Sequence, residues 1–340
     1  MSGATPSTGV KSSIATTNIR HDMRHTTGVI VLNYNNAADT MACIDSLRAV
    51  TEQECNHKIV IVDNCSVREC VESIDRYVEG FDSSLLLNEG DATPRTLPYI
   101  THLRLEHNYG YAQGNNRGLD LIYADEEIDR ILIINNDILF TQSLITPLNE
   151  SLDSLSDCAI ITPLLYKRDG QSVDHNCARK AITKAQIFWV WAMLFRTTFG
   201  IVPRIYKAQS ILPTVPADER FVRLELPSGS CMLCDKQLFR DLGSFDPNTF
   251  LYYEENILWE KIRPTGLVNY LDREISAIHL GAATTNTKAP SVFIAKVTVE
   301  SVRYYLRHYV KANWLYMAAM EIFFAAFKFK IKIRNLLCKR

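Results

Sequence analysis

The sequence predicts an α/β fold in which a mostly parallel sheet has helices on both faces. Residues 28–32, 58–62 and 131–134 form continuous apolar runs, the pattern of strands that are buried on both sides. Helical patterns follow the first two runs, at residues 38–50 and 67–77. This alternation of strand and helix is typical of right-handed crossovers that leave one crevice along the strand ends.

Polar side chains follow each of these three predicted strands. They are Asn33 and Asn35 after the first, Asp63 and Asn64 after the second, and Asn135, Asn136 and Asp137 after the third. Ligands of open parallel sheets bind outside the carboxyl ends of the strands, so these side chains are candidates for a binding site. A turn or a helix cap explains any one of the three equally well. The repetition favours the binding site.

A glycine-spaced, amide-rich loop runs from Asn108 to Gly118 and opens the helix before the third strand. Together with Asp137 it provides the groups that hold a nucleoside diphosphate and its metal ion. Mg²⁺ and Mn²⁺ take oxygen ligands and often use only one or two protein carboxylates, so a single aspartate is sufficient. The glycine spacing differs from the dinucleotide pattern G-x-G-x-x-G, which argues against an NAD-linked oxidoreductase.

The ordered series of motifs resembles the family 2 glycosyltransferases of the GT-A fold. Within that family it is most similar to the rhamnosyltransferase-like branch, which builds bacterial surface polysaccharides. The similarity covers about residues 27–285. Its downstream part consists of Pro227-Ser228-Gly229-Ser230, Gly243-x-Phe245-Asp246, Glu254-Glu255 and His279-x-x-Gly281.

This resemblance implies a Rossmann-like, mixed and mostly parallel sheet, followed here by C-terminal helices. It also implies a metal-dependent, inverting transfer from a nucleoside-diphosphate sugar, either dTDP-rhamnose or a UDP-sugar. The acceptor would be a glycan or a lipid-linked glycan of cell-surface polysaccharide synthesis, such as O-antigen or capsule.

The resemblance assigns roles to individual residues. Asp63 corresponds to the contact with the nucleobase, and the other donor contacts are Asn33, Asn35, Asn64, Gly110, Gly114, Asn115 and Asn136. Asp137 corresponds to the last acid of the metal-binding DXD motif, with Mn²⁺ or Mg²⁺ as the cofactor. His279 is a further candidate for the metal, although a hydrogen-bonded loop histidine is the alternative. The predicted acceptor side consists of Ser228, Gly229, Glu254, Trp189 and Trp191.

Glu255 occupies the position of the family's catalytic base, which is usually an aspartate. Sugar transfer requires a carboxylate that removes the proton of the attacking hydroxyl, while a metal stabilises the departing diphosphate. The alternative is a charged first turn of a helix at residues 256–262, where the helix dipole favours acids. Ile257 replaces an acid that is often found two positions after the base, which bears on acceptor recognition.

Composition agrees with a cytoplasmic enzyme. The chain has 340 residues, 47% of them hydrophobic, and its 37 basic and 38 acidic residues argue against a nucleic-acid-binding protein. Nine cysteines without a preceding secretory signal do not indicate a disulfide framework. We interpret Cys231 and Cys234 as buried packing rather than as a zinc or redox pair.

We expect three parts along the chain. Residues 1–25 form a disordered tail, residues 26–285 the catalytic domain, and residues 286–340 a basic helical segment. The catalytic domain divides into a nucleotide-sugar half at 26–140 and an acceptor half at 141–285. Within the first half, residues 82–97 are expected to form a loop before a strand at 99–105.

Two apolar segments bear on membranes. Residues 185–195 contain two tryptophans but are too few to span a bilayer, so they would lie at its interface or form an acceptor-side wall. The apolar stretch 317–327 is followed by six Lys and Arg residues. It fits a peripheral anchor on the anionic cytoplasmic face of the inner membrane. Packing on the catalytic domain or in a homodimer is the equal alternative.

Two other functions remain open from the sequence. A sugar nucleotidyltransferase could use a similar sheet, but it usually carries a glycine-rich, basic loop after the first strand, where this chain has Asn33-Tyr34-Asn35-Asn36. A non-catalytic nucleotide-sugar-binding subunit is suggested by Ile257 and by glutamate at the position of the base. Such a subunit would bind donor without turnover.

Overall fold

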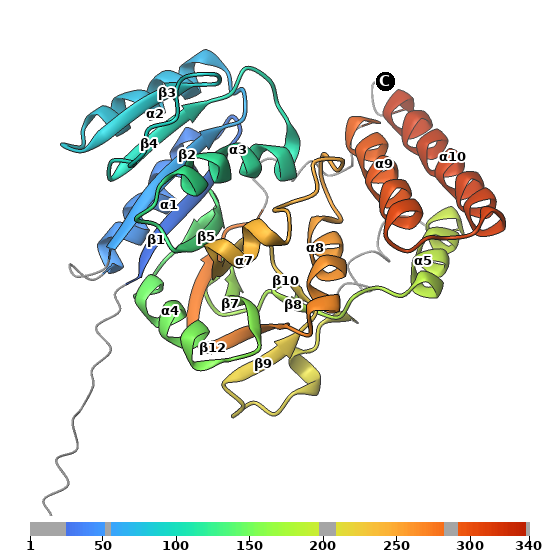
Figure 1. The fold of residues 1–340 in the computed structure, drawn as a ribbon. Coiled ribbons are helices and arrows are strands. Elements are labelled where there is room, and N and C mark those ends of the chain that lie inside the picture. Colours follow the sequence, from blue (N-terminus) through green and yellow to red (C-terminus); the bar gives the residue numbers. More distant parts are fainter. Residues whose placement is uncertain (1–24, 52–55, 197–208, 282–291, 338–340) are drawn as a thin grey trace, which may run out of the picture.

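A mixed sheet between two layers of helices, joined to a group of C-terminal helices, makes up the computed structural model (Figure 1). The structure describes residues 25–51, 56–196, 209–281 and 292–337. The first half of the chain alternates strands and helices. Its elements are β1 (Thr26–Asn33), α1 (Ala37–Val50), β2 (Asn56–Asp63), α2 (Arg68–Glu79), β3 (Ser84–Asn88), β4 (Ile100–Arg104), α3 (Gly110–Ala124) and β5 (Arg130–Asn135).

The second half is less regular and ends in two long helices. Its elements are β6 (Ile138–Leu139), α4 (Ile145–Ser154), β7 (Cys158–Lys167), β8 (Ala178–Arg179), α5 (Lys184–Arg196), the 3-10 helix η2 (Leu212–Thr214), β9 (Phe221–Leu224), β10 (Leu226–Pro227), β11 (Cys231–Asp235), α7 (Lys236–Asp241), α8 (Glu254–Ile262), the 3-10 helix η3 (Arg263–Thr265), β12 (Val268–His279), α9 (Val292–His308) and α10 (Trp314–Leu337).

The main sheet of the described chain has the order β3-β4-β2-β1-β5-β11-β7-β12-β6, with β9 paired to β12. Strands β1 to β5 run parallel to one another. Strand β11 lies antiparallel between β5 and β7, while β12 is parallel to β7. The predicted mixed, mostly parallel sheet is therefore confirmed. This order puts the carboxyl ends of β1, β2, β5, β7 and β12 at one edge, together with the start of β11.

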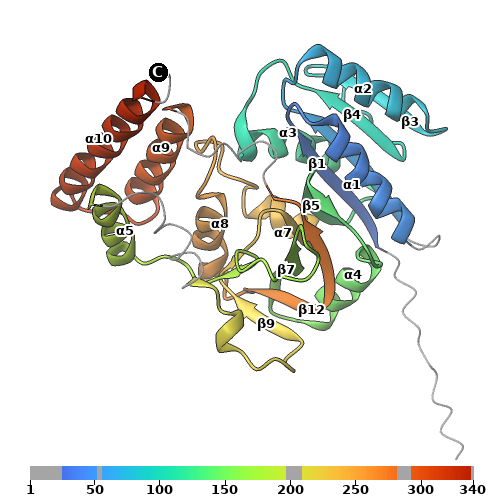
Figure 2. The same cartoon turned by 180° about the vertical axis from the view of Figure 1, so that it is seen from behind.

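Two hydrophobic clusters cover the two faces of the sheet. Alternate residues of one strand point to opposite faces, so Val29 and Val31 join one cluster and Ile30 joins the other. Helices α1, α2 and α4 pack in the first cluster, and α3, α7 and α8 pack in the second. Figure 2 shows the arrangement from behind. The predicted helices on both faces are present.

The predicted strands and helices match the observed elements to within a few residues at each end. The loop expected at 82–97 is wrong in part, because residues 84–88 form the edge strand β3, parallel to β4. The short apolar run Leu85-Leu86-Leu87 explains the strand, since Leu87 packs in the second cluster. The expected tail at 1–25 lies outside the described residues except for His25, which contacts Asp129 and Asp153.

A third hydrophobic cluster holds α5, α9 and α10 together (Figure 1). Asp246 joins this unit to the part of the structure that carries the sheet, by accepting hydrogen bonds from the hydroxyls of Tyr304 and Tyr309, at 3.0 and 2.5 Å. The Ser301 hydroxyl also donates to the Leu251 carbonyl at 2.8 Å. In the described part of the chain, no helix combines the length and the apolar character needed to cross a membrane.

The turn into α3 requires glycine at position 110. Gly110 has φ +76°, and a Cβ added to it would lie 2.0 Å from the carbonyl oxygen of Phe250. The next residue, Tyr111, donates its backbone N–H to that same oxygen at 2.8 Å. The start of α3 is therefore fixed against the loop before α8.

We expect Gly110→Ala to destabilise the fold far more than Gly90→Ala. Both glycines have positive φ, which costs an alanine about 1–2 kcal/mol, but a Cβ at Gly90 meets nothing within 4 Å. The clash at Gly110 should add about 2 kcal/mol or more. Urea unfolding of the two variants measures the difference. Equal losses would show that the contact with Phe250 is not a constraint.

Candidate active site

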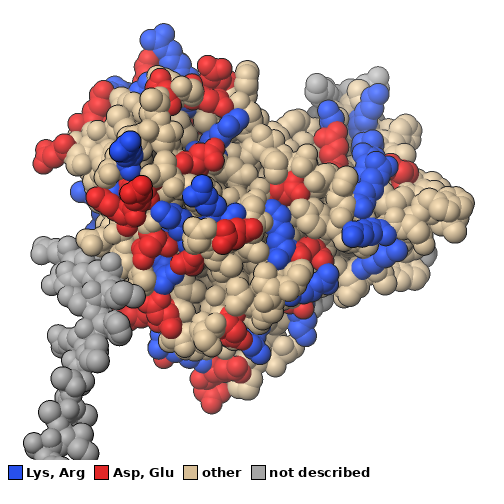
Figure 3. Space-filling view, viewed as in Figure 1, with Lys and Arg blue, Asp and Glu red and all other residues tan. Residues whose placement is uncertain are grey.

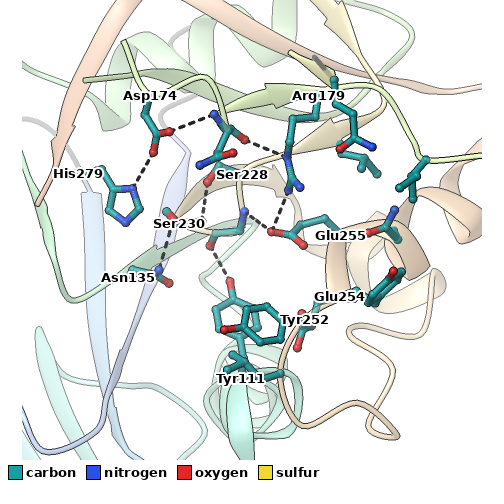
Figure 4. Close-up of a pocket in the computed structure, with 18 residues that line it drawn as sticks. Tyr111, Asn135, Asp174, Arg179, Ser228, Ser230, Tyr252, Glu254, Glu255 and His279 are labelled. Atoms are coloured by element: carbon teal, nitrogen blue, oxygen red, sulfur yellow. Dashed lines mark hydrogen bonds and ion pairs between the residues drawn. The ribbon is translucent and has the colours of Figure 1, made fainter. Parts of the chain in front are cut away.

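A pocket of about 360 Å³ opens at the edge of the sheet where these strand ends meet. Its walls come from the end of β5, the loop after β7, the segment before β11, the loop before α8 and the end of β12 (Figure 4). Polar side chains from all five segments line it. They include Asn135, Asp174, Arg179, Ser228, Glu255 and His279.

Glu255 lies in the first turn of α8, on the wall of the pocket. Its Oε1 accepts a hydrogen bond from the backbone N–H of Gly229 at 3.2 Å and lies 3.5 Å from a guanidinium nitrogen of Arg179. A Cβ at Gly229 would come within 3.2 Å of that oxygen and 3.0 Å of the Tyr111 hydroxyl. The backbone of Gly229 therefore approaches the Glu255 carboxylate closely, and glycine suits this position because it has no Cβ.

The neighbouring Glu254 is buried, although it also belongs to the pocket lining. Burial, reinforced by the charge of Glu255, raises the pKa of Glu254 to about 8. Among the described residues its Oε1 has no hydrogen-bond partner. At neutral pH, Glu254 is therefore mostly a neutral acid that can donate a hydrogen bond, whereas Glu255 is held by a cation and a backbone amide.

The loop before α8 has an unusual backbone. Tyr252 and Tyr253 have φ angles of 75° and 73°, in the left-handed region that bulky residues seldom occupy. Such conformations cost about 1–3 kcal/mol each and persist where the surroundings enforce them. Both tyrosines line the pocket. This loop sets the direction in which Glu254 and Glu255 enter the site.

His279, at the end of β12, lies between two aspartates. Its Nε2 is 3.5 Å from Asp137 Oδ2, and its Nδ1 is 3.1 Å from Asp174 Oδ2. Burial alone would lower the pKa of His279, but the two aspartates outweigh it and raise the pKa to about 9. The imidazolium and the two carboxylates form one charged cluster, and in Figure 4 His279 lies on the opposite side from Glu255.

Asp137 and His279 have suitable chemistry for a divalent ion, because carboxylate oxygen and imidazole nitrogen both bind Mn²⁺. An ion there would displace the histidine proton, and Asp174 would keep the ring oriented through Nδ1, as carboxylates do for metal-binding histidines. The described residues contain no group of three side chains able to hold a metal by themselves. The remaining ligands would therefore have to come from water and a diphosphate.

A polar chain connects this cluster to Glu255. Asp174 Oδ1 accepts the backbone N–H of Asn176 at 3.0 Å, and the Asn176 carbonyl accepts the Arg179 Nε–H at 3.2 Å. Arg179 in turn contacts Glu255. Figure 4 shows this path across the pocket. The loop after β7 thus positions both walls of the site.

Sequence reasoning missed Asp174, Asn176 and Arg179. The signal was present, because the apolar run of β7 is followed by a polar loop, the same pattern that marked the ends of β1, β2 and β5. What the sequence did not provide was the direction of β7, which depends on the antiparallel strand β11 beside it.

The predicted donor residues at the ends of β1 and β2 are buried and hold loops together. Asp63 accepts hydrogen bonds from Asn33 Nδ2 and from the backbone N–H of Ser66, both at 2.7 Å. Asn64 donates to the Gly110 carbonyl at 2.9 Å and accepts the Tyr109 backbone N–H. Direct contacts of Asn33, Asp63 and Asn64 with a donor stay predictions.

The other predicted donor residues also fix the backbone. Asn136 Nδ2 donates to the Thr40 hydroxyl at 3.0 Å, and the Asn35 side chain accepts the Val67 backbone N–H at 2.7 Å. Asn115 Nδ2 donates to the Tyr111 carbonyl. A Cβ at Gly114 would lie 2.8 Å from the Leu32 side chain, so Gly114 lets α3 approach β1 closely.

The predicted acceptor side is brought together only in part. Ser228, Gly229 and Glu254 line the pocket with Glu255, but the tryptophans do not. Trp191 is buried against Phe324 and Phe327 of α10, with ring centroids 4.7 and 5.2 Å apart. Trp189, 62% exposed, lies on the same helix. Helix α5 packs on α10 through Trp191, and an acceptor-side role for either tryptophan stays a prediction.

Comparison with known proteins identifies the family. The model of glycosyl transferase family 2 matches residues 28–202, just over half of the chain. The chain is a family 2 glycosyltransferase. A relative is the low-salt glycan biosynthesis hexosyltransferase Agl10 of Haloferax volcanii, 22% identical over 243 residues. That alignment covers 71% of this chain and 62% of the relative, so the chain spans less than two thirds of its length.

A solved structure supports the fold. The crystal structure of GalNAc-T7 with UDP, GalNAc and Mn²⁺ matches with a TM-score of 0.55 at 15% identity. The match covers 84% of this chain and 48% of that one. The GT-A fold expected for this glycosyltransferase is therefore confirmed.

We expect the stability difference between the wild type and Glu254→Gln to depend on pH. The folded protein keeps the Glu254 proton up to about pH 8, while an unfolded chain releases it near the ordinary value of 4.5. Raising the pH from 5 to 8 should therefore lower the free energy of unfolding of the wild type relative to Glu254→Gln, by about 1 kcal/mol or more.

Chemical unfolding at several pH values measures this trend. The exposed Glu79→Gln on α2 is the control, and it should follow the wild type throughout. A constant difference between the wild type and Glu254→Gln would mean that Glu254 is ionised across this range.

Proposed function

We propose that this glycosyltransferase moves a sugar from a nucleoside-diphosphate sugar to a hydroxyl of a glycan or lipid-linked glycan, with inversion. The observation that carries the proposal is the position of Glu255 on one wall of the pocket, with His279 across from it. Asp137 is buried and does not line the pocket itself, but it lies 3.5 Å from His279 Nε2. One carboxylate is placed to accept a proton, and the other belongs to a cluster suited to a metal ion and a diphosphate.

Glu255 acts as the general base. Both of its contacts, from Gly229 and Arg179, are made by Oε1, so Oε2 is the oxygen that accepts the proton of the attacking hydroxyl. The nearby guanidinium and amide hold the carboxylate in place, which a general base requires. Glu254, mostly protonated at neutral pH, can donate a hydrogen bond to the acceptor.

Asp137 and His279 are the residues that would bind the metal ion next to the departing nucleoside diphosphate. When bound there, Mn²⁺ or Mg²⁺ would supply Lewis-acid stabilisation of the departing nucleoside diphosphate. Asp174 keeps the imidazole oriented through Nδ1. The crystal structure of GalNAc-T7 with UDP and Mn²⁺ supports this choice of cofactor and nucleotide class.

The donor in this proposal is dTDP-rhamnose or a UDP-sugar, and the product belongs to cell-surface polysaccharide synthesis at the cytoplasmic side of the membrane. The relative Agl10, a hexosyltransferase of glycan biosynthesis, supports a glycan product. The division into a nucleotide half before residue 140 and an acceptor half after it belongs to the same proposal, although β5 and β11 pair across that boundary.

The alternative of a non-catalytic subunit was based on Ile257 and on glutamate at the position of the base. The structure provides another explanation for Ile257. Ile257 is buried in the cluster that joins α8 to α9 and α10. An apolar residue at this position is therefore explained by packing of the helical unit. The glutamate in place of aspartate keeps a carboxylate on the pocket wall.

We expect Glu255→Gln to lower kcat by about a hundred- to ten-thousand-fold, because general-base catalysis typically contributes that much. Donor binding should change only a few-fold, since the amide preserves shape and hydrogen bonding. Release of nucleoside diphosphate from a panel of nucleotide sugars, with acceptor glycans and Mn²⁺ or Mg²⁺, measures turnover. Calorimetry measures donor binding.

Glu260→Gln, on the same helix, is the matched control and should keep its turnover. Full activity of Glu255→Gln would refute the assignment of the base. Donor binding by the wild type without release, across all donors and acceptors, would support the non-catalytic subunit.

We expect Asp174→Asn to raise the Mn²⁺ concentration needed for half-maximal activity by about 10- to 100-fold, the usual effect of losing a carboxylate that orients a metal-binding histidine. At saturating Mn²⁺, kcat should approach that of the wild type. Asp169→Asn, in the same loop but outside the pocket lining, is the control. An unchanged metal requirement would show that His279 does not bind the ion.

A further inference from the structure

Helix α10 has two apolar faces, and only one of them is covered. Its inner face packs in the third hydrophobic cluster through Met317, Met320, Phe324, Phe327 and Ile331. Large apolar side chains on the outer face are between 40% and 66% exposed. We call these five the outer stripe: Leu315, Ile322, Phe329, Ile333 and Leu336.

The outer stripe is continuous along the helix. Its members recur at intervals of three, four and seven residues, which places them on one side of an α-helix. Ala318 and Ala325 are exposed and fall at the same spacing. From Leu315 to Leu336 the stripe is about 32 Å long. Isolated exposed apolar residues need no explanation, whereas a contiguous stripe marks an interaction site.

The stripe faces away from the rest of the protein. Helix α9 contacts α10 through the Arg303–Glu321 ion pair, at 2.6 Å, and α5 contacts it through Trp191 on Phe324. The contact of Phe324 lies on the inner face, and that of Glu321 lies at a margin of the outer stripe. In Figures 1 and 2, α10 is the outermost element of the helical unit.

Cations accompany the stripe. Lys328 and Lys332 fall along one margin of it at helical spacing, and Lys330 and Arg334 fall along the other. Residues 292–337 contain eight Lys and Arg against two Glu, although the whole chain has a net charge of −1. Figure 3 shows a column of blue side chains on the helical unit beside uncharged surface. The partner of this surface is therefore both apolar and anionic.

A second copy of the chain fits this surface less well. Lys332 lies at the same heptad spacing as Ala318 and Ala325, so two stripes packed in parallel would bring these lysines together. The α10 sequence contains one acid, Glu321, and it is already paired with Arg303 and Arg307. A bilayer accepts the apolar side chains, while lysines extend to the phosphates of its lipids.

We propose that the outer stripe of α10 and its flanking cations form a docking surface for an anionic lipid bilayer, with the helix lying in the plane of the interface. This inference goes beyond the proposed function and does not depend on the donor, the metal or catalysis. It places the GT-A domain beside a membrane, where a lipid-linked acceptor would be presented.

Co-sedimentation of the full chain with vesicles tests the proposal. One set is pure phosphatidylcholine, and the other contains phosphatidylglycerol as well. We expect binding to the anionic vesicles, at least tenfold weaker binding to the neutral ones, and weakening by salt. Lys328→Glu/Lys332→Glu and Ile322→Gln/Phe329→Gln should each reduce binding to anionic vesicles at least tenfold.

Matched control positions lie far from α10 in the sequence, in and around α2 and in the loop after β3. Arg76→Glu/Arg95→Glu changes the same charge, and Val67→Gln removes an apolar side chain of similar exposure. Both should bind anionic vesicles like the wild type. Thermal unfolding of the α10 variants close to that of the wild type shows that their loss of binding is not a loss of fold.

Three results would overturn the proposal. The first is absence of binding to anionic vesicles, and the second is equal loss in the controls and the α10 variants. The third is a dimer in light scattering that Ile322→Gln/Phe329→Gln converts to a monomer while vesicle binding persists. That last result would assign the stripe to an interface between copies.

Discussion

The pairing of β11 between β5 and β7 determines the geometry of the site. Because β11 is antiparallel to β5, its first residues lie at the edge where β5 ends, with Cys231 opposite Ile134. The backbone hydrogen bond from Asn135 to the Ser230 carbonyl, at 2.9 Å, continues that pairing beyond the strand. This pairing places the backbone N–H of Gly229 next to the Glu255 carboxylate.

The same pairing also sets the direction of the strands beyond it. Strand β7 is antiparallel to β11, and β12 is parallel to β7, so both end at the same edge. The loop after β7 supplies Asp174, the short strand β8 that follows it supplies Arg179, and the end of β12 supplies His279. A site with two charged walls thus follows from one strand order.

Close approaches of the backbone hold the second wall in place. Gly110 lets the start of α3 approach the Phe250 carbonyl, and Tyr111 then donates to the Gly229 carbonyl at 2.6 Å. The left-handed tyrosines that follow turn the chain into α8. The position of this wall depends on contacts between segments that are more than a hundred residues apart, and these close approaches favour glycine at positions 110 and 229.

Much of the fold could be predicted from the sequence, because buried parallel strands are apolar throughout and stop at polar residues. The same rule placed Asp137 at a strand end, whereas the candidates Glu255 and His279 came from the resemblance to the family. It could not distinguish residues that line the pocket from residues that hold loops. Asp63 and Asn64 accept hydrogen bonds from loop backbone, Asp63 from Ser66 and Asn64 from Tyr109. These partners cannot be read from the pattern of a single strand.

Other features depended on tertiary contacts that no local pattern contains. The packing of Trp191 could not be predicted, because its partners on α10 lie more than 130 residues later. Asp174 was not recognised in the sequence, because its importance comes from its contact with His279, which lies 105 residues later. Cys231 and Cys234, in contrast, were predicted correctly as buried residues. Their burial follows from the apolar sequence of their own strand and requires no knowledge of tertiary contacts.

The most direct test of two separate charged walls is a crystal structure with Mn²⁺ and a nucleoside diphosphate, with the ion located by anomalous scattering. The account predicts an ion bound to Asp137 and His279 Nε2, with Asp174 still on Nδ1 and Glu255 free of metal across the pocket. An ion bound by Glu255, or a diphosphate bound away from β5 and β12, would contradict it.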